Sequence, residues 1–223
     1  MKPLVEQIYS NIEQRFTGID DMAHGWEHVK RVYNLALMLA DREGADPTIV
    51  ALAALLHDLG RTISLQEETA HHMHHADLSV TLASELLTTY HVSHEEQQPI
   101  LHAILAHSFS RGVEPQTLEA CIVRDADRLD GLGAIGILRW AATGVTRKTF
   151  ETSFYHPSDP FGQSHTLDDT RYMLDHFYSK LLKLSLTMLT DTGRELAKQR
   201  TDFMLDYLEQ LRRELALLET SPA

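Results

Sequence analysis

The spacing of apolar residues along the chain predicts helices from end to end. Apolar positions recur every three or four residues over 4–16 and 26–43, as expected for helices with one buried face. The same pattern predicts further helices at about 47–58, 76–90, 95–106, 116–129, 137–142, 167–186 and 190–218. No segment alternates convincingly with a period of two, so we expect an all-α fold.

Two stretches interrupt the helical pattern. Residues 62–73 are expected to form a polar loop or a short helix. Residues 144–167 are the longest interval without periodicity and contain two glycines and two prolines. A connection of that length in a compact domain is typical of a functional lid or a flexible loop.

One apolar helix is expected to deliver His57 and Asp58 side by side. Asp46 followed by Pro47 is a typical helix start, and the run LAALL leads directly to the histidine and the aspartate. Gly60 follows, as glycine does where a helix ends. At a helix end, two adjacent side chains can converge on one ion. An imidazole with a carboxylate suits Mn²⁺, Fe²⁺ or Zn²⁺, and further oxygen ligands suit Mg²⁺.

Composition limits the classes of function. The 223 residues, 43% of them hydrophobic, suffice for one large helical domain. A net charge of −12 argues against binding a nucleic-acid polymer, but it allows a small phosphorylated substrate. No apolar run approaches the length of a membrane span. The amphipathic N-terminus and the lone cysteine, Cys121, predict a cytoplasmic protein.

Two further residues are candidates to complete a metal site. His28 lies in a helix that can pack beside the His57–Asp58 pair, and Asp127 follows an apolar helix just before a glycine-rich break. Two imidazoles and two carboxylates leave coordination positions open for water and substrate, as a catalytic metal requires. Taken singly, each of these residues is more often part of a core, a cap or a surface ion pair.

The ordered set of His28, His57–Asp58 and Asp127 resembles the H…HD…D pattern of HD-domain phosphohydrolases. The flanking sequences EHVKRV, LLHDLGR and DADRLDGLGAIG match as well. Residues 106–110 (AHSFS) and 167–184 (LDDTRYMLDHFYSKLLKL) extend the resemblance to a bacterial stand-alone subgroup similar to nucleotide pyrophosphohydrolases.

This resemblance implies a fold, a cofactor and a reaction. The fold is a single HD-type helical bundle over 1–223, with a core at about 20–132 and a C-terminal helical extension at about 133–223. The cofactor is a divalent ion, Mn²⁺ or Mg²⁺ first, with Fe²⁺, Zn²⁺, Ni²⁺ or Co²⁺ as alternatives. The reaction is hydrolysis of a phosphate bond in a nucleotide, with cleavage of a nucleoside triphosphate to monophosphate and pyrophosphate as first choice.

Other functions remain open from the sequence. They are a phosphomonoesterase or phosphodiesterase on the same site, a non-catalytic metal- or nucleotide-binding regulator, and a purely structural helical module. The expected partner is a small phosphorylated substrate, with no nucleic-acid polymer and no membrane, and a homodimer stays open.

Candidate roles follow for individual residues. Asp58 is expected both to ligate the ion and to accept a proton from the attacking water. Arg61 follows Asp58 by three residues and is within reach of the same site, where its planar guanidinium could bind phosphate oxygens. A solvated arginine at the helix end is an equal alternative. The resemblance makes His107 an active-site residue that donates to a phosphate or acts as an acid. Lys180 and Arg171 are expected phosphate contacts, with solvated side chains as the alternative.

Two more features come from the resemblance. In relatives with two metals, a histidine after the HD pair and another before the final Asp bind a second ion, and His75 and His107 could fill those places. The alternative for the cluster HHMHH (71–75) is a polar helix start. Related sequences often carry an Asp where this chain has Gly25, so a carboxylate that supports a ligand is expected to be missing.

Overall fold

The computed structural model describes residues 2–19, 21–63, 74–146 and 151–219, and these form an all-α protein. Within these ranges the β-structure amounts to one isolated bridge between Ser153 and Tyr172. The α-helices are α1 (Lys2–Phe16), α2 (Trp26–Glu43), α3 (Pro47–Leu56), α4 (His75–Thr89), α5 (His94–His107), α6 (Leu118–Asp130), α7 (Gly133–Thr146), α8 (Asp175–Ser179) and α9 (Asp191–Glu219). Short 3₁₀ helices are η1 (Leu59–Thr62), η3 (Phe109–Arg111) and η4 (Leu181–Thr187). The all-α prediction is confirmed.

The helices divide into two compact units, which are described separately. The first unit comprises Met1–Asp130 together with Leu189–Gly193, and the second comprises Gly131–Met188 together with Arg194–Ala223. Among the described helices, none combines the length and the hydropathy needed to cross a membrane.

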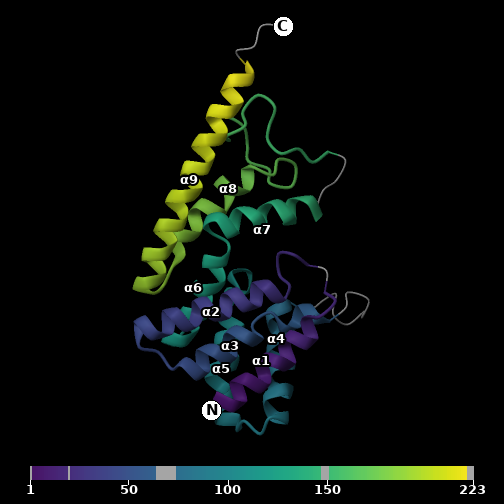
Figure 1. Ribbon diagram of the computed structural model, residues 1–223, viewed down its shortest axis with the longest axis vertical. Coiled ribbons are helices and arrows are strands. Elements are labelled where there is room, and N and C mark those ends of the chain that lie inside the picture. The colour runs from purple at the N-terminus through teal and green to yellow at the C-terminus, as the bar shows by residue number, and fades with distance from the viewer. Residues whose placement is uncertain (1, 20, 64–73, 147–150, 220–223) are drawn as a thin grey trace. The chain divides into compact units, whose positions relative to one another are not determined.

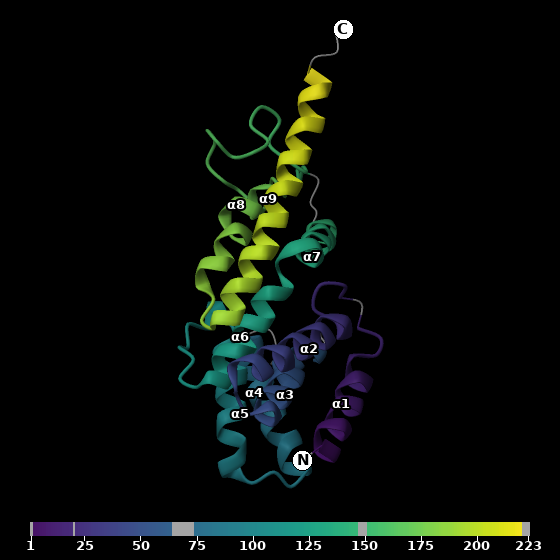
Figure 2. The ribbon, with the colours of Figure 1, turned by 60° about the vertical axis from the view of Figure 1, so that its left-hand side comes forward.

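Helix α3 is the centre of the first unit. Every residue from Val50 to Leu56 is buried, as expected for a helix that is apolar on all sides. It contacts α1, α2, α5 and α6, and Figures 1 and 2 both show these elements gathered in one bundle. Asp46 caps its first turn by accepting the backbone N–H of Thr48 at 2.7 Å. The core therefore surrounds the helix whose end carries His57.

A buried carboxylate fixes helix α6 in the same unit. Asp125 accepts hydrogen bonds from the backbone N–H groups of Leu189 and Thr190 and from the Thr190 hydroxyl. A Cβ at Gly193 would lie 2.4 Å from Asp125 Oδ2, so this approach requires glycine. Because Asp127 lies on the same helix, this clamp also holds the candidate ligand in place.

The second unit packs around aromatic side chains. Trp140 donates its indole N–H to the carbonyl of Met173 at 2.7 Å, and its ring meets Phe177 edge-on at 4.9 Å between centroids. Phe177 in turn stacks on Tyr207 of α9 at 6.2 Å.

The prediction of one long helix over 167–186 is wrong. Turns occupy the start of that range, and only the five-residue α8 and the 3₁₀ helix η4 follow. A continuous helix does not form because aspartate side chains in this range accept hydrogen bonds from nearby backbone N–H groups. Asp168 Oδ1 accepts the N–H of Thr170, and Asp175 Oδ2 accepts the N–H of Asp168, so side chains take groups that a helix would use.

One other boundary differs from expectation. Helix α7 begins at Gly133 and runs to Thr146, so Gly136 lies inside it instead of ending helical order. A Cβ at Gly136 would lie 2.3 Å from the carbonyl oxygen of Gly131. Close packing against that oxygen therefore requires glycine at position 136. Most of 62–73 falls in 64–73, outside the described residues.

His165 links two parts of the chain that follow α7 through hydrogen bonds from both of its ring nitrogens. Its Nδ1 lies 2.9 Å from Asp159 Oδ2, and its Nε2 lies 2.8 Å from Asp175 Oδ2. The ring of His156 stacks on it at 4.3 Å, and Tyr172 meets it edge-on. Both carboxylates accept, so both ring nitrogens donate and the ring is an imidazolium. These hydrogen bonds, first to Asp159 and then to Asp175, raise the pKa of His165 above 6.5.

We expect His165→Asn to lower the melting temperature most below pH 6.5 and progressively less at higher pH. A raised folded pKa contributes its full stability below the unfolded value of 6.5 and loses it as pH rises through the folded value. Thermal unfolding of both proteins across this range measures the difference. A difference that does not change with pH would contradict the imidazolium assignment.

Candidate metal centre

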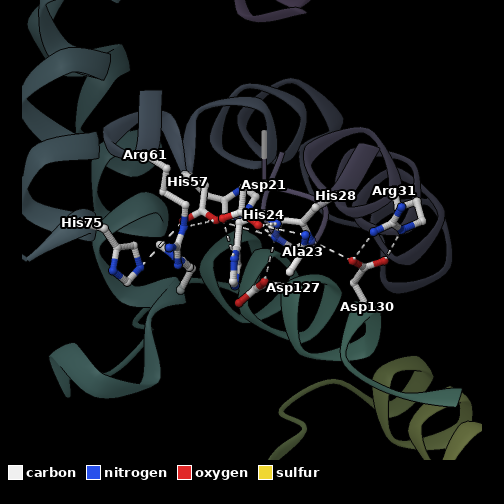
Figure 3. Close-up of polar contacts among 12 residues, drawn as sticks. Asp21, Ala23, His24, His28, Arg31, His57, Arg61, His75, Asp127 and Asp130 are labelled. Atoms are coloured by element: carbon white, nitrogen blue, oxygen red, sulfur yellow. Dashed lines mark hydrogen bonds and ion pairs between the residues drawn. The ribbon is translucent and has the colours of Figure 1, made fainter. Parts of the chain in front are cut away.

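Six side chains of the first unit converge in one place, from the end of α3 and from α2, α4, α5 and α6. They form two groups, in each of which the candidate ligand atoms lie within 4.8 Å of one another. The groups are His28, His57 and Asp127, and Asp58, His75 and His107. Figure 3 shows that His28, His57, His75 and Asp127 come together from separate helices. The structure therefore brings together the four ligands expected from the sequence, which are His28, His57, Asp58 and Asp127.

Two buried imidazoles present lone pairs to each other. His28 Nδ1 lies 2.7 Å from Asp130 Oδ2, and His57 Nδ1 lies 2.7 Å from the carbonyl oxygen of Ala54. Since these oxygens only accept, each Nδ1 donates, and each Nε2 of the neutral ring carries a lone pair. Burial lowers the pKa of His57 to about 4, so this ring is neutral at pH 7. The two Nε2 atoms lie 3.3 Å apart, a contact that a cation between them would stabilise.

Asp127 completes this group. Its Oδ1 lies 3.4 Å from His28 Nε2. Burial by itself raises the pKa of the Asp127 carboxyl, but a His28 ring protonated at Nε2 outweighs burial through its hydrogen bond and charge and holds that pKa well below the usual range. In the neutral ring the same Nε2 presents its lone pair to a metal ion. Ligand atoms about 2.1 Å from one ion lie roughly 3.0–3.4 Å apart at octahedral or tetrahedral angles. Two separations in this group, 3.3 Å between the two Nε2 atoms and 3.4 Å between Asp127 Oδ1 and His28 Nε2, lie in that range.

The Oδ2 atom of Asp58 faces the same group. It accepts from Arg61 Nε at 2.7 Å, and it lies 3.7 Å from His28 Nε2 and 3.8 Å from His57 Nε2. Burial raises the pKa of Asp58, but His57 and Arg61 lower it below its ordinary value, so the group is an anion. Arg61, the expected phosphate clamp, thus pairs with a candidate ligand.

The Oδ1 atom of Asp58 faces the second group. It is buried and has no hydrogen-bond partner among the described residues. It lies 3.7 Å from His75 Nε2 and 3.8 Å from His107 Nε2. Because His107 Nδ1 donates to the carbonyl of Ile104, its Nε2 is turned toward Asp58. A buried carboxylate oxygen surrounded by imidazole nitrogens fits a cation.

Close packing between η1 and α4 places His75. A Cβ at Gly60 would lie 2.6 Å from the His75 carbonyl oxygen, and Gly60 N–H donates to Ser79 Oγ at 2.9 Å. His74 instead caps α4 by accepting the N–H of Ala76. Of the cluster 71–75, residues 71–73 lie outside the described residues.

The site has a closed floor and an accessible rim. The floor consists of side chains exposed by 3% or less, namely His28, His57, Asp58 and His107. The rim consists of partly exposed side chains, namely Asp127 (28%), His75 (26%) and Arg61 (32%). A ligand therefore approaches from the side of the rim.

Sequence reasoning missed Asp130 and Arg31. Asp130 is buried, binds His28 Nδ1 and accepts two hydrogen bonds from Arg31, at 2.7 and 3.0 Å (Figure 3). The signal was available, because Asp130 follows Asp127 by one helical turn and Arg31 follows His28 likewise. Asp130 is thus a carboxylate that supports a candidate ligand, although position 25 carries none. At Gly25 itself a Cβ would lie 2.6 Å from a backbone oxygen.

Arg171 and Lys180 belong to the second unit. Arg171 is exposed, with its guanidinium 5.4 Å from the centroid of the Tyr172 ring. Lys180 is exposed directly after α8. Their roles as substrate contacts stay predictions.

Comparison with known proteins agrees with this geometry. The family model described as HD domain matches residues 25–132. YpgQ of Bacillus subtilis is 35% identical over 215 residues, which are 94% of this chain and 93% of YpgQ. The crystal structure of YpgQ in complex with ADP matches with a TM-score of 0.71 and 32% identity, covering 94% of each chain. An HD-superfamily hydrolase from Bacillus thuringiensis matches with a TM-score of 0.73 and 30% identity, covering 96% of this chain and 98% of that one.

We expect Asp130→Asn to weaken divalent-metal binding roughly 10- to 100-fold while helix content is retained. The amide lacks the charge that orients His28 and supports its Nε2 as a ligand. Competition titration with a metal-sensitive dye measures the affinity. Asp202→Asn, which removes an exposed carboxylate on α9, is the matched control. Equal affinities in Asp130→Asn and wild type would contradict this role.

Proposed function

Because this chain belongs to the HD superfamily of hydrolases, we propose that it is a metal-dependent nucleotide hydrolase that converts nucleoside triphosphates to monophosphates and pyrophosphate. The observation that carries the proposal is the convergence of buried imidazole lone pairs and carboxylates on one position, open on one side to solvent. The nucleotide assignment is supported by YpgQ, which was crystallised with ADP.

The first ion is assigned to His28, His57, Asp58 and Asp127. The set fits a divalent ion of the Mn²⁺, Fe²⁺ or Zn²⁺ type through its imidazoles, and Mg²⁺ through its carboxylates and added water. When bound, such an ion neutralises phosphoryl charge and makes water more acidic.

The protein side chains supply the remaining chemistry. With a single ion bound at the first group, Asp58 is the candidate to accept the proton of the attacking water, since its buried Oδ1 carries no hydrogen bond from the described residues. Arg61 holds the other oxygen of Asp58 and extends to the rim, where its guanidinium can contact phosphate. His107 forms part of the floor. With one ion bound, its Nε2 is proposed to contact the phosphoryl group; with two, the same atom would hold the second ion.

A second ion is assigned to Asp58, His75 and His107. The two oxygens of Asp58 face different groups of nitrogens, so Asp58 would contribute a ligand to each group if both were occupied. Burial lowers the pKa of His75 to about 4, so it too is a neutral ligand at pH 7. Two-metal sites stabilise both the attacking and the leaving oxygen in phosphoryl transfer.

A small nucleotide is favoured over a polymer. Ribonuclease Y of Thermoanaerobacter pseudethanolicus is 36% identical over 103 residues, but these are only 46% of this chain and 18% of that protein. The net charge of −12 opposes contact with a long phosphate backbone. A nucleoside triphosphate presents its charge in one place, where an ion and Arg61 can neutralise it.

We expect pyrophosphate release from nucleoside triphosphates only with Mn²⁺ or Mg²⁺, and loss of about 10²-fold or more in kcat in Asp58→Asn. The substitution removes a metal ligand and the proton acceptor together. Phosphate and pyrophosphate are followed separately over a nucleotide panel, with and without chelator. Asp41→Asn, an exposed carboxylate on α2, is the control.

Other results would overturn the proposal in distinct ways. Release of phosphate without pyrophosphate would indicate a phosphomonoesterase. Metal and nucleotide binding without turnover would indicate a regulator. Full turnover in Asp58→Asn would exclude the role of Asp58.

We expect wild type to bind about two Mn²⁺ per chain and His75→Ala to bind about one. His75 belongs only to the second group, so its loss leaves the first intact. Equilibrium dialysis with elemental analysis gives the stoichiometry, and His94→Ala provides an exposed histidine outside both groups as control. One ion in wild type would contradict the second site.

A further inference from the structure

An exposed phenylalanine lies next to the metal centre and takes no part in the mechanism described above. Phe109 is the first residue of η3, two residues after His107, and it is 68% exposed. The Cα atoms of these two residues are at most about 7 Å apart, since each residue spans roughly 3.3–3.6 Å. A single exposed apolar residue is common on protein surfaces, so the interest of Phe109 lies in its neighbours.

Helix α6 flanks Phe109 on one side. The guanidinium carbon of Arg128 lies over the Phe109 ring, 5.4 Å from its centroid. Arg128 follows the candidate ligand Asp127 directly and is only 6% exposed, so it lies at a fixed place beside the metal centre. One side of the ring therefore has a partner on α6, and the exposure of the residue shows that much of the remaining ring surface is open to solvent.

The start of α4 holds the other residues of η3. His74 Nε2 lies 2.8 Å from Ser110 Oγ, and the rings of His74 and His75 have centroids 4.4 Å apart. Arg111 Nε donates to both carboxylate oxygens of Asp77 at 3.0 Å. The second and third residues of η3 thus fix the turn beside the second group of candidate ligands, and the exposed aromatic ring of the first residue is not needed to form it.

An aromatic ring in this position suits the base of a nucleotide. The floor of the metal centre is closed, so a nucleotide whose phosphates bind there has to place its base toward the rim and the surface around it. Every nucleobase has a flat π-face that stacks favourably on an aromatic side chain. Stacking also requires an aromatic surface that is open to solvent before the ligand arrives, as that of Phe109 is.

We propose that Phe109 is a substrate-binding residue whose ring stacks on the base of the nucleotide, on the side away from Arg128. The inference rests on the proposed nucleotide function and adds the base to the parts of the substrate that the protein binds. Because stacking uses a feature common to all bases, the substrate class is a nucleoside polyphosphate with a purine or a pyrimidine base.

Three substitutions at one position separate stacking from other roles. We expect Phe109→Ala and Phe109→Leu to bind ADP and CDP about 5-fold or more weakly than wild type, because the leucine retains apolar bulk but has no π-face. We expect Phe109→Trp to retain the affinity. Pyrophosphate, which has no base, should bind equally to wild type and to all three variants.

The measurement is calorimetric titration of Mn²⁺-loaded protein with ADP, with CDP and with inorganic pyrophosphate. Metal content and melting temperature of each variant establish that the site and the fold are intact. Phe203→Ala, which removes another exposed phenylalanine ring from α9, is the matched control and should bind all three ligands as wild type does.

Each result decides the matter. Wild-type affinity for ADP in Phe109→Ala or in Phe109→Leu would overturn the stacking contact. A loss in Phe109→Trp as large as that in Phe109→Ala would overturn it as well, and so would a parallel loss of ADP and pyrophosphate. The expected binding pattern without hydrolysis of any nucleotide would support the contact and overturn the proposed function. Hydrolysis of nucleotides with unchanged ADP and CDP affinity in Phe109→Ala would do the reverse.

Discussion

The burial of Asp58 is the constraint on which the first unit depends. The apolar helix α3 leads directly to the Asp58 anion. Burying an isolated carboxylate costs far more free energy than the packing around it contributes. Arg61 compensates one oxygen, but the other oxygen faces the imidazoles of His75 and His107 and has no hydrogen-bond partner among the described residues. Such an arrangement becomes favourable when a cation occupies the space between the carboxylate and the rings. The helices that surround α3 supply those rings, so the fold and the metal centre share one cause.

Helix ends orient two of the site histidines, and a buried aspartate orients a third. The last carbonyls of a helix lack intrahelical partners. His57 and His107 both use such a carbonyl three residues back, on Ala54 and Ile104, to hold Nδ1 and turn Nε2 inward. His28 lies in the first turn of α2, where carbonyls accept intrahelical bonds, so it requires a partner from another helix. Asp130 provides it, and Arg31 offsets the buried charge that this partner introduces.

Sequence patterns predicted correctly those features of the fold that depend on neighbouring residues, such as helix starts and ends. The bounds of α2 and the capped start of α3 followed from periodicity, glycine and the Asp–Pro pair. The expected helix over 167–186 failed because Asp168 and Asp175 bind backbone groups, and periodicity does not record that competition. The four clustered ligands were found because their order and flanking residues form a pattern. The Asp130 contact was missed because it joins residues 102 positions apart, and the direction of a side chain across a helix pair is a property of packing.

The charge of the site couples metal binding to substrate binding. Without an ion, Asp58 and Asp127 contribute two negative charges and Arg61 one positive charge, while His57 and His75 are neutral at pH 7. A polyphosphate that approaches this rim, on a chain of net charge −12, therefore meets repulsion. One or two divalent ions reverse the sign locally without changing the fold. For the proposed nucleotide substrate, the carboxylates that would repel it also make its binding conditional on the metal. The ligand set, more than the basic residues of the chain, would then determine where a phosphate binds.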